Sequence, residues 1–210
     1  SKNILLNTDS YKVSMWKQYP VGTTGVFSYI ESRGGRYDQT VMFGLQAFIK
    51  EYLLDPITQS DIDIAEEILL AHGEPFNRSG WQYILDKHDG YLPVIIRAVP
   101  EGTVVPVKNV LATIENTDPN VPWLTTWLET PLLRAIWYPT TVATQSWSIR
   151  KVILDYLEKT GDPALIDFKL HDFGARGVSS LESAGIGGAA HLVNFMGTDT
   201  VTGLLYAREY

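Results

Sequence analysis

Residues 171–182 read HDFGARGVSSLE, and this stretch decides the fold class of the chain. It closes an extended run, residues 168–173, that we predict to be a β-strand, and its two glycines permit a sharp turn. Ser179 with Glu182 fits the capping box that opens a helix. The sequence therefore predicts a strand, a turn and a helix in close succession, which is typical of an α/β protein.

The predicted strand would present cationic and aromatic side chains on one face. Alternation along a strand places Lys169, His171 and Phe173 on the same side. Arg176 lies just ahead of the predicted helix, where free backbone N–H groups and the helix dipole favour an anion such as phosphate. The same residues also fit an ordinary strand–turn–helix corner with a surface arginine, and composition does not decide between the two.

A second strand is predicted over residues 193–196, with Asp199 in the loop that follows it. Strand ends that face a shared opening carry the chemistry of barrel-like α/β folds, although a lone loop aspartate more often caps a helix. Between the two strands, residues 185–190 read GIGGAA, which indicates a helix in close approach to another backbone. These glycines lie inside the predicted helix, so they are not a Rossmann fingerprint.

These motifs, together with segments in the first part of the chain, resemble the nicotinamide phosphoribosyltransferase family. The matching segments run in order along nearly all 210 residues: NILL (3–6), TDSYKV (8–13), KQYP (17–20), VPEG (99–102), ENTDP (115–119), WYPTTVAT (137–144), HDFGARGVSS (171–180), SAGIG (183–187), HLVNF (191–195) and GTDT (197–200). Agreement in order over that length is more specific than any single motif.

The resemblance implies an enzyme of NAD biosynthesis that converts nicotinamide and phosphoribosyl pyrophosphate into nicotinamide mononucleotide and pyrophosphate. It implies Mg²⁺ as cofactor, ATP as a coupling substrate, and a homodimer with active sites at the subunit interface. The implied architecture is an N-terminal α/β sheet domain, residues 1–140, followed by the start of an incomplete TIM-like α/β barrel, residues 141–210. This is the barrel-containing class of phosphoribosyltransferases.

The resemblance also implies roles for five side chains. Phe173 and the partner subunit's Tyr11 sandwich the pyridine ring of nicotinamide. Asp199 accepts a hydrogen bond from the carboxamide N–H, and Arg176 binds near the ring and the product phosphate. Arg33 reaches pyrophosphate across the dimer. Aromatic stacking suits a flat, weakly polar ring, because such pairs add roughly 0.5–1.5 kcal/mol beyond simple burial.

Members of the family are more than twice as long as this chain. The remaining family features, including the histidine phosphorylated during ATP hydrolysis and further phosphate-binding arginines, would follow Tyr210. Residues 201–210 carry apolar side chains at helical spacing and end without a stop signal. We therefore expect an N-terminal portion that is inactive alone, with its catalytic residues beyond Tyr210.

Two other functions stay open. Nicotinate phosphoribosyltransferase has the same architecture, but Asp199 favours the amide substrate, because a carboxylate beside the carboxylate of nicotinate is repulsive. A catalytically inactive dimerisation module, which keeps the surface around Tyr11 and Arg33, is the more distant alternative.

Composition is consistent with a cytoplasmic enzyme. The net charge of −7 disfavours nucleic-acid binding, and no window resembles a membrane span or a signal peptide. The chain has no cysteine, and no pair among its four histidines has metal-ligand spacing, so no metal site is predicted. Trp123, Trp127 and Trp137 lie at helical spacing and are predicted to pack in a core.

Local patterns predict the remaining elements. Helices are expected over 8–19, 41–53, 62–71 (capped by Ser60), 80–87, 123–137 (interrupted at Pro131) and 143–159, and strands over 26–31, 93–98 and 110–115. The last two strands are expected to pair.

Overall fold

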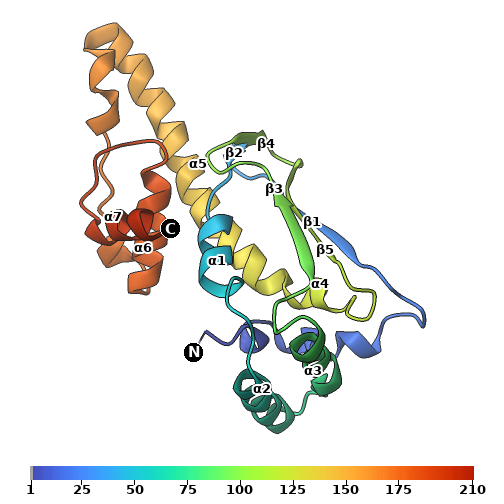
Figure 1. Ribbon diagram of the computed structural model, residues 1–210. Coiled ribbons are helices and arrows are strands. Elements are labelled where there is room, and N and C mark those ends of the chain that lie inside the picture. Colours follow the sequence, from blue (N-terminus) through green and yellow to red (C-terminus); the bar gives the residue numbers. More distant parts are fainter. Residues whose placement is uncertain (1) are drawn as a thin grey trace. The chain divides into compact units, whose positions relative to one another are not determined.

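The computed structural model describes residues 2–210 and contains both helices and strands (Figure 1). The chain forms two compact units, each built from three separate segments. The first unit takes residues up to Ile30, Phe48–Ala98 and Val110–Arg134; the second takes Glu31–Ala47, Val99–Asn109 and Ala135–Tyr210. The mixture of helices and strands confirms the predicted α/β class. The domain division at residue 140 and the barrel expected to start there stay predictions.

The elements in chain order are η1 (Ile4–Leu6), η2 (Ser10–Lys12), η3 (Met15–Lys17), β1 (Phe27–Glu31), β2 (Gln39–Val41), α1 (Leu45–Tyr52), α2 (Gln59–His72), α3 (Arg78–Lys87), β3 (Val94–Ala98), β4 (Val104–Pro106), β5 (Val110–Asn116), α4 (Leu124–Trp127), α5 (Glu129–Thr160), η4 (Pro163–Phe168), η5 (Gly174–Gly177), α6 (Leu181–His191) and α7 (Val201–Glu209). The η elements are short 3₁₀ turns.

The first unit contains a three-stranded sheet in the order β1–β5–β3 (Figure 1). Strands β3 and β5 are antiparallel, and Ile96 lies opposite Ile114. The predicted strands over 26–31, 93–98 and 110–115, and the pairing of the last two, are therefore confirmed. Both partners are rich in β-branched residues, which favour strands: Val94, Ile95 and Ile96 in β3, and Val110, Thr113 and Ile114 in β5.

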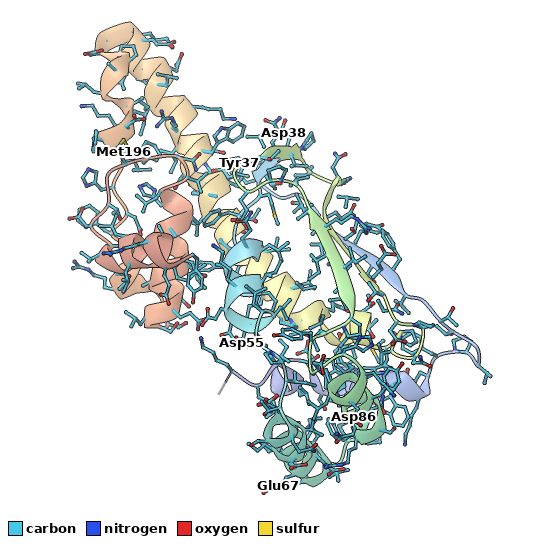
Figure 2. All side chains as sticks on the ribbon, viewed as in Figure 1. Tyr37, Asp38, Asp55, Glu67, Asp86 and Met196 are labelled. Carbon is cyan, nitrogen blue, oxygen red and sulfur yellow. The ribbon has the colours of Figure 1, made fainter. Side chains whose placement is uncertain are left out.

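Helices α2 and α3 of the first unit begin at side-chain caps. Thr58 forms a capping box with Asp61, so the cap predicted at Ser60 is wrong by two residues. Asn77 caps α3 by accepting a hydrogen bond from the backbone N–H of Gly80. Figure 2 shows Glu67 at the outer side of α2, where its carboxylate is exposed to solvent.

A cluster of tryptophans fills the core of the first unit. Trp81, Trp123 and Trp127 meet edge to face, with ring centroids 4.9–5.8 Å apart, and all three are buried. The prediction of core packing is confirmed for Trp123 and Trp127. It is wrong for Trp137, which is 60% exposed.

The helix predicted over residues 8–19 is wrong. Two separate 3₁₀ turns, η2 and η3, stand in its place. Lys12, the last residue of η2, is buried and forms an ion pair with Glu129, and Val13, which follows it, is fully buried. A helix of this length is marginal in water, so burial and pairing of Lys12 decide the local conformation instead.

Helix α5 is one continuous element, so the predicted break between residues 137 and 143 is wrong. Pro131 lies in its first turn, where the missing N–H is tolerated, and Pro139 lies inside it. The carbonyl oxygen of Ala135, which Pro139 deprives of its usual donor, faces Gly44; a Cβ atom at Gly44 would lie 2.4 Å from that oxygen. Because Gly44 has no side chain, the backbone at residue 44 can pack directly against α5 at Ala135 and Pro139.

The second unit has a two-stranded antiparallel sheet, β2 with β4, that packs on α5 and α6. Val41, Ala143 and Ala190 form its buried centre. The backbone N–H of Val41 donates to the Thr144 hydroxyl at 2.9 Å. The helix predicted from residue 41 therefore begins only at Leu45, because residues 39–41 are strand β2.

Helices α6 and α7 approach each other through glycines. A Cβ atom at Gly203 would lie 2.7 Å from the carbonyl carbon of Gly188, and one at Gly188 would lie 2.8 Å from the Cα of Gly203. This confirms both the close backbone approach predicted from residues 185–190 and the helix predicted over the last ten residues. The N-cap of α6 is Ser180, whose hydroxyl accepts from the N–H of Ser183, so the cap predicted at Ser179 is one residue early.

Candidate functional site

The predicted site residues Phe173 and Asp199 lie on two neighbouring loops of the second unit. We call residues 169–173 the first site loop and residues 196–200 the second. Neither loop is a strand, so the strands predicted over 168–173 and 193–196 are wrong. Phe168 ends the 3₁₀ turn η4, and Met196, labelled in Figure 2, is 64% exposed in the loop after α6.

One backbone hydrogen bond joins the two site loops directly and another joins the second site loop to η4, without forming a ladder. The N–H of Asp199 donates to the carbonyl of Asp172 at 3.0 Å, and the N–H of Met196 donates to the carbonyl of Asp167 at 2.8 Å. The Thr200 hydroxyl donates to the same Asp172 carbonyl at 3.3 Å. These bonds bring together two sequence motifs that the chain separates by a helix.

His171 connects the two loops at their exposed surface. Its Nδ1 lies 3.1 Å from Oδ2 of Asp199, and its ring lies beside that of Phe173, with centroids 6.5 Å apart and planes inclined by 24°. Within residues 2–210, no described hydrogen bond involves the other oxygen of Asp199. The carboxylate is thus held at one oxygen and open at the second.

Phe173 is available to a ligand, because its side chain is 62% exposed. An exposed phenyl ring on one loop, next to a second loop that carries a carboxylate, suits a flat polar ring, which can stack on the phenyl group and donate to the carboxylate. The backbone around it is fixed by Asp172, whose Oδ1 accepts from the N–H of Gly174 at 2.8 Å.

Arg176 lies in the 3₁₀ turn η5, four residues before the cap of α6, and its side chain is exposed. This is the position predicted for it, ahead of a helix N-terminus. The first turn of α6 also carries Glu182, so the environment is not purely cationic. Arg176 shares this 3₁₀ turn with Gly174 and Gly177, neither of which adopts a positive φ.

The other two predicted residues are exposed and lie apart from the site loops in sequence. Arg33 comes two residues after the end of strand β1, and it belongs to the second unit. Tyr11 belongs to the first unit, is 58% exposed, and is mounted on η2 beside the buried Lys12, whose ammonium lies 4.8 Å from the phenol ring centroid. Their roles across a dimer stay predictions.

Tyr138 was not predicted as part of this region. It lies on α5 under helix α6, where a Cβ atom at Gly187 would come within 2.6 Å of its hydroxyl. Burial raises the pKa of the Tyr138 phenol, and the nearby Asp172 carboxylate raises it further. The glycine pattern of α6 signalled a close neighbour, but not which residue supplies it.

The described part of the chain offers no ready metal centre. Among residues 2–210 no group of three or more His, Asp and Glu side chains is arranged to hold a metal ion. No helix in that range is long and apolar enough to cross a membrane.

Comparison with known proteins shows which families and proteins this chain is similar to. The family model described as nicotinamide phosphoribosyltransferase, N-terminal domain, matches residues 3–96, and the nicotinate phosphoribosyltransferase (NAPRTase) family model matches residues 168–210. The nicotinamide phosphoribosyltransferase of Xanthomonas campestris pv. campestris (strain 8004) is 60% identical over 99% of this chain. That of Acinetobacter baylyi (strain ATCC 33305 / BD413 / ADP1) is 33% identical over 99%. The chain spans 45% of the length of each.

Two solved structures share the fold. Human nicotinic acid phosphoribosyltransferase matches with a TM-score of 0.56 and 19% identity over 94% of this chain and 37% of its own. The nicotinate-nucleotide pyrophosphorylase of Pyrococcus furiosus matches with a TM-score of 0.58 and 17% identity over 97% of this chain and 40% of its own. The fold is therefore one found among enzymes of this phosphoribosyltransferase class. By sequence, the chain is similar to nicotinamide phosphoribosyltransferases along nearly its whole length.

Proposed function

We propose that this chain forms the base-recognition part of an enzyme that transfers a phosphoribosyl group from phosphoribosyl pyrophosphate to nicotinamide. The products are nicotinamide mononucleotide and pyrophosphate, in the biosynthesis of NAD. The observation that carries the proposal is the Asp199 carboxylate, held at one oxygen by His171 beside the exposed ring of Phe173. Relatives named nicotinamide phosphoribosyltransferase, which are 60% and 33% identical to this chain, support the choice of reaction.

Base recognition follows from the chemistry of the two loops. The pyridine ring stacks on Phe173, and the partner subunit's Tyr11 covers its other face. The free oxygen of Asp199 accepts a hydrogen bond from the carboxamide N–H, while His171 holds the other oxygen in place. The Asp199 carboxylate accepts a hydrogen bond from the amide of nicotinamide, whereas it repels the carboxylate of nicotinate.

The transfer step needs the pyridine nitrogen in line with the leaving group. Its lone pair forms the new C–N bond to C1 of the ribose as the bond from C1 to the pyrophosphate oxygen breaks. The pyridine nitrogen of nicotinamide carries no proton, so no general base is required at the ring. Holding the ring in this geometry lowers the barrier by orientation, and Arg176 and Arg33 offset the negative charge on the phosphate groups.

We propose Mg²⁺ as a cofactor and ATP as a coupling substrate of the full-length protein only. The described residues do not provide a set of ligands suited to a metal ion. Dimerisation is likewise part of the proposal, because Tyr11 and Arg33 are assigned to the neighbouring subunit's site.

A nicotinate-specific transferase is the second candidate. The match of residues 168–210 to the nicotinate phosphoribosyltransferase family model favours it, since this segment contains both site loops. The two candidates differ in one prediction, which is the sign of the interaction between Asp199 and the ring substituent.

The deciding experiment compares nicotinamide with nicotinate in the full-length protein. Product formation from phosphoribosyl pyrophosphate and each base is followed by chromatography, and binding of nicotinamide mononucleotide is measured by calorimetry. We expect turnover with nicotinamide to exceed turnover with nicotinate. Preference for nicotinate would select the second candidate. Absence of both turnover and nucleotide binding would select an inactive dimerisation module.

A further inference from the structure

The two site loops are joined through a buried imidazole that the proposed reaction does not use. His191 is the last residue of α6 and is only 3% exposed. Its Nε2 lies 3.2 Å from the carbonyl oxygen of Leu170, in the first site loop, and 3.0 Å from that of Gly197, in the second. One side chain therefore contacts both loops.

The position of this imidazole is fixed from several directions. Its Nδ1 lies 2.9 Å from the hydroxyl of Ser146 on α5, and its ring stacks on Phe195, with centroids 5.2 Å apart and planes inclined by 10°. Both partners of Nε2 are carbonyl oxygens, so Nε2 carries a hydrogen and donates it. Buried polar groups with this many partners hold their neighbours in one arrangement.

The two carbonyls that His191 contacts stand close to the residues of the proposed site. Leu170 directly precedes His171, and Gly197 is two residues before Asp199. Gly197 is also in contact with His171, because a Cβ atom there would lie 2.4 Å from Nε2 of that ring. A shift of either carbonyl would therefore alter the distance between Asp199 and its neighbours His171 and Phe173.

We infer that His191 is a positioning residue of the base-recognition site, which sets the separation of the two site loops and thereby places the Asp199 carboxylate relative to the Phe173 ring. This inference rests on the proposed function. A histidine that merely filled the core would not need polar contacts to three separate segments, two of which carry the site.

A pair of amide substitutions separates this role from general stability. In His191→Asn the amide reaches the place of Nδ1 and keeps the Ser146 contact, whereas in His191→Gln it reaches the place of Nε2 and keeps the carbonyl contacts. In the full-length protein we expect His191→Asn to reduce the preference for nicotinamide over nicotinate about tenfold, and His191→Gln to restore it. Met42→Ala, which opens a cavity at a fully buried residue of the same unit, is the control for lowered stability and should leave the preference unchanged.

Amide hydrogen exchange without ligand tests the inference independently of the reaction. The N–H of Asp199, bonded to Asp172, should exchange about tenfold faster in His191→Asn and at the original rate in His191→Gln. Equal exchange at Asp199 in the original protein and in His191→Asn would overturn the inference, as would equal behaviour of the two variants. If the original protein shows no preference between the bases, the proposed function fails, and the exchange rates alone decide whether His191 holds the loops.

Discussion

Nδ1 of His171 lies 3.1 Å from Oδ2 of Asp199, across 28 residues of sequence. This contact explains how a solvent-exposed carboxylate keeps a defined orientation, since an unattached side chain at that exposure would sample several rotamers. The orientation matters because the proposed preference for nicotinamide depends on which oxygen of Asp199 meets the ring substituent.

Asp199→Asn should weaken the preference for nicotinamide over nicotinate. The amide side chain removes the negative charge, so it no longer repels the carboxylate of nicotinate. We expect the ratio of the two binding constants to fall about tenfold or more, as measured by competition calorimetry. Asp155→Asn on α5, which also removes an exposed carboxylate of the second unit, is the matched control. A ratio that stays the same in Asp199→Asn would argue against a role for this carboxylate.

Phe173→Ala should weaken binding of nicotinamide about tenfold, because the stacking surface for the ring is lost. The ring is 62% exposed, so the melting temperature should change little. Phe168→Ala is a close control, since Phe168 lies five residues earlier and is 60% exposed. Equal losses of affinity in the two variants would mean that Phe173 has no special place at the ring.

Gly197→Ala should displace the His171 ring rather than unfold the protein. The added methyl group would lie 2.4 Å from Nε2 of His171, and this exposed ring is free to swing away. The bond to Asp199 would then be lost, and nicotinamide affinity should fall about three- to tenfold. A nuclear magnetic resonance titration of the His171 ring protons would report the change; an unaltered His171 signal would show that the loop itself had moved instead.

Much of this fold was predictable where the determining interactions are local. Strands β3 and β5 follow from their runs of β-branched and apolar residues, and the close approach of α6 follows from its glycines. The 3₁₀ turns around Lys12 were not predictable, because the partner of Lys12, Glu129, lies 117 residues away. The predicted strands at the site failed for a related reason. A strand forms only where a neighbouring strand pairs with it through backbone hydrogen bonds, and a run of residues with high β-propensity does not provide that partner.

The site itself was predicted in part. Phe173 and Asp199 were assigned through family resemblance, and the structure does place them on adjoining loops. The contact of Asp199 with His171 joins two motifs that the sequence keeps apart, so no spacing rule reveals it. His191 was hidden for a different reason: a histidine inside an apolar stretch is more often a core residue, and only its contacts with two loop carbonyls indicate otherwise.

Gly203→Ala should destabilise the second unit by about 1–3 kcal/mol, since the new methyl group would overlap the Gly188 backbone. Thermal unfolding followed by circular dichroism should show a lower midpoint. Gly25→Ala serves as the control, because its added Cβ would meet no atom within 4 Å. Unchanged unfolding of Gly203→Ala would mean that the helices separate at little cost.

The stability of the first unit should depend on Asp118 at acidic pH. Hydrogen bonds from the Asn120 backbone N–H, from His88 and from Tyr83 lower the pKa of Asp118 from 3.8 to about 2. The folded state therefore binds this proton less readily than the unfolded state, and the stabilisation is complete above about pH 4 and lost as the pH falls toward 2. Asp118→Asn should remove this part of the pH dependence, as measured by urea unfolding at several pH values between 2 and 7. Parallel curves for the two proteins would contradict the assignment.

The contact of Gly188 in α6 with Gly203 in α7 has a consequence for which sequences this fold can accept. Helix α7 begins two residues after Asp199, so the separation of α6 and α7 also governs where the second site loop ends. Under the proposed function, larger residues at positions 188 and 203 would displace the Asp199 carboxylate without changing its chemistry, so base specificity would be constrained from two positions outside the site loops.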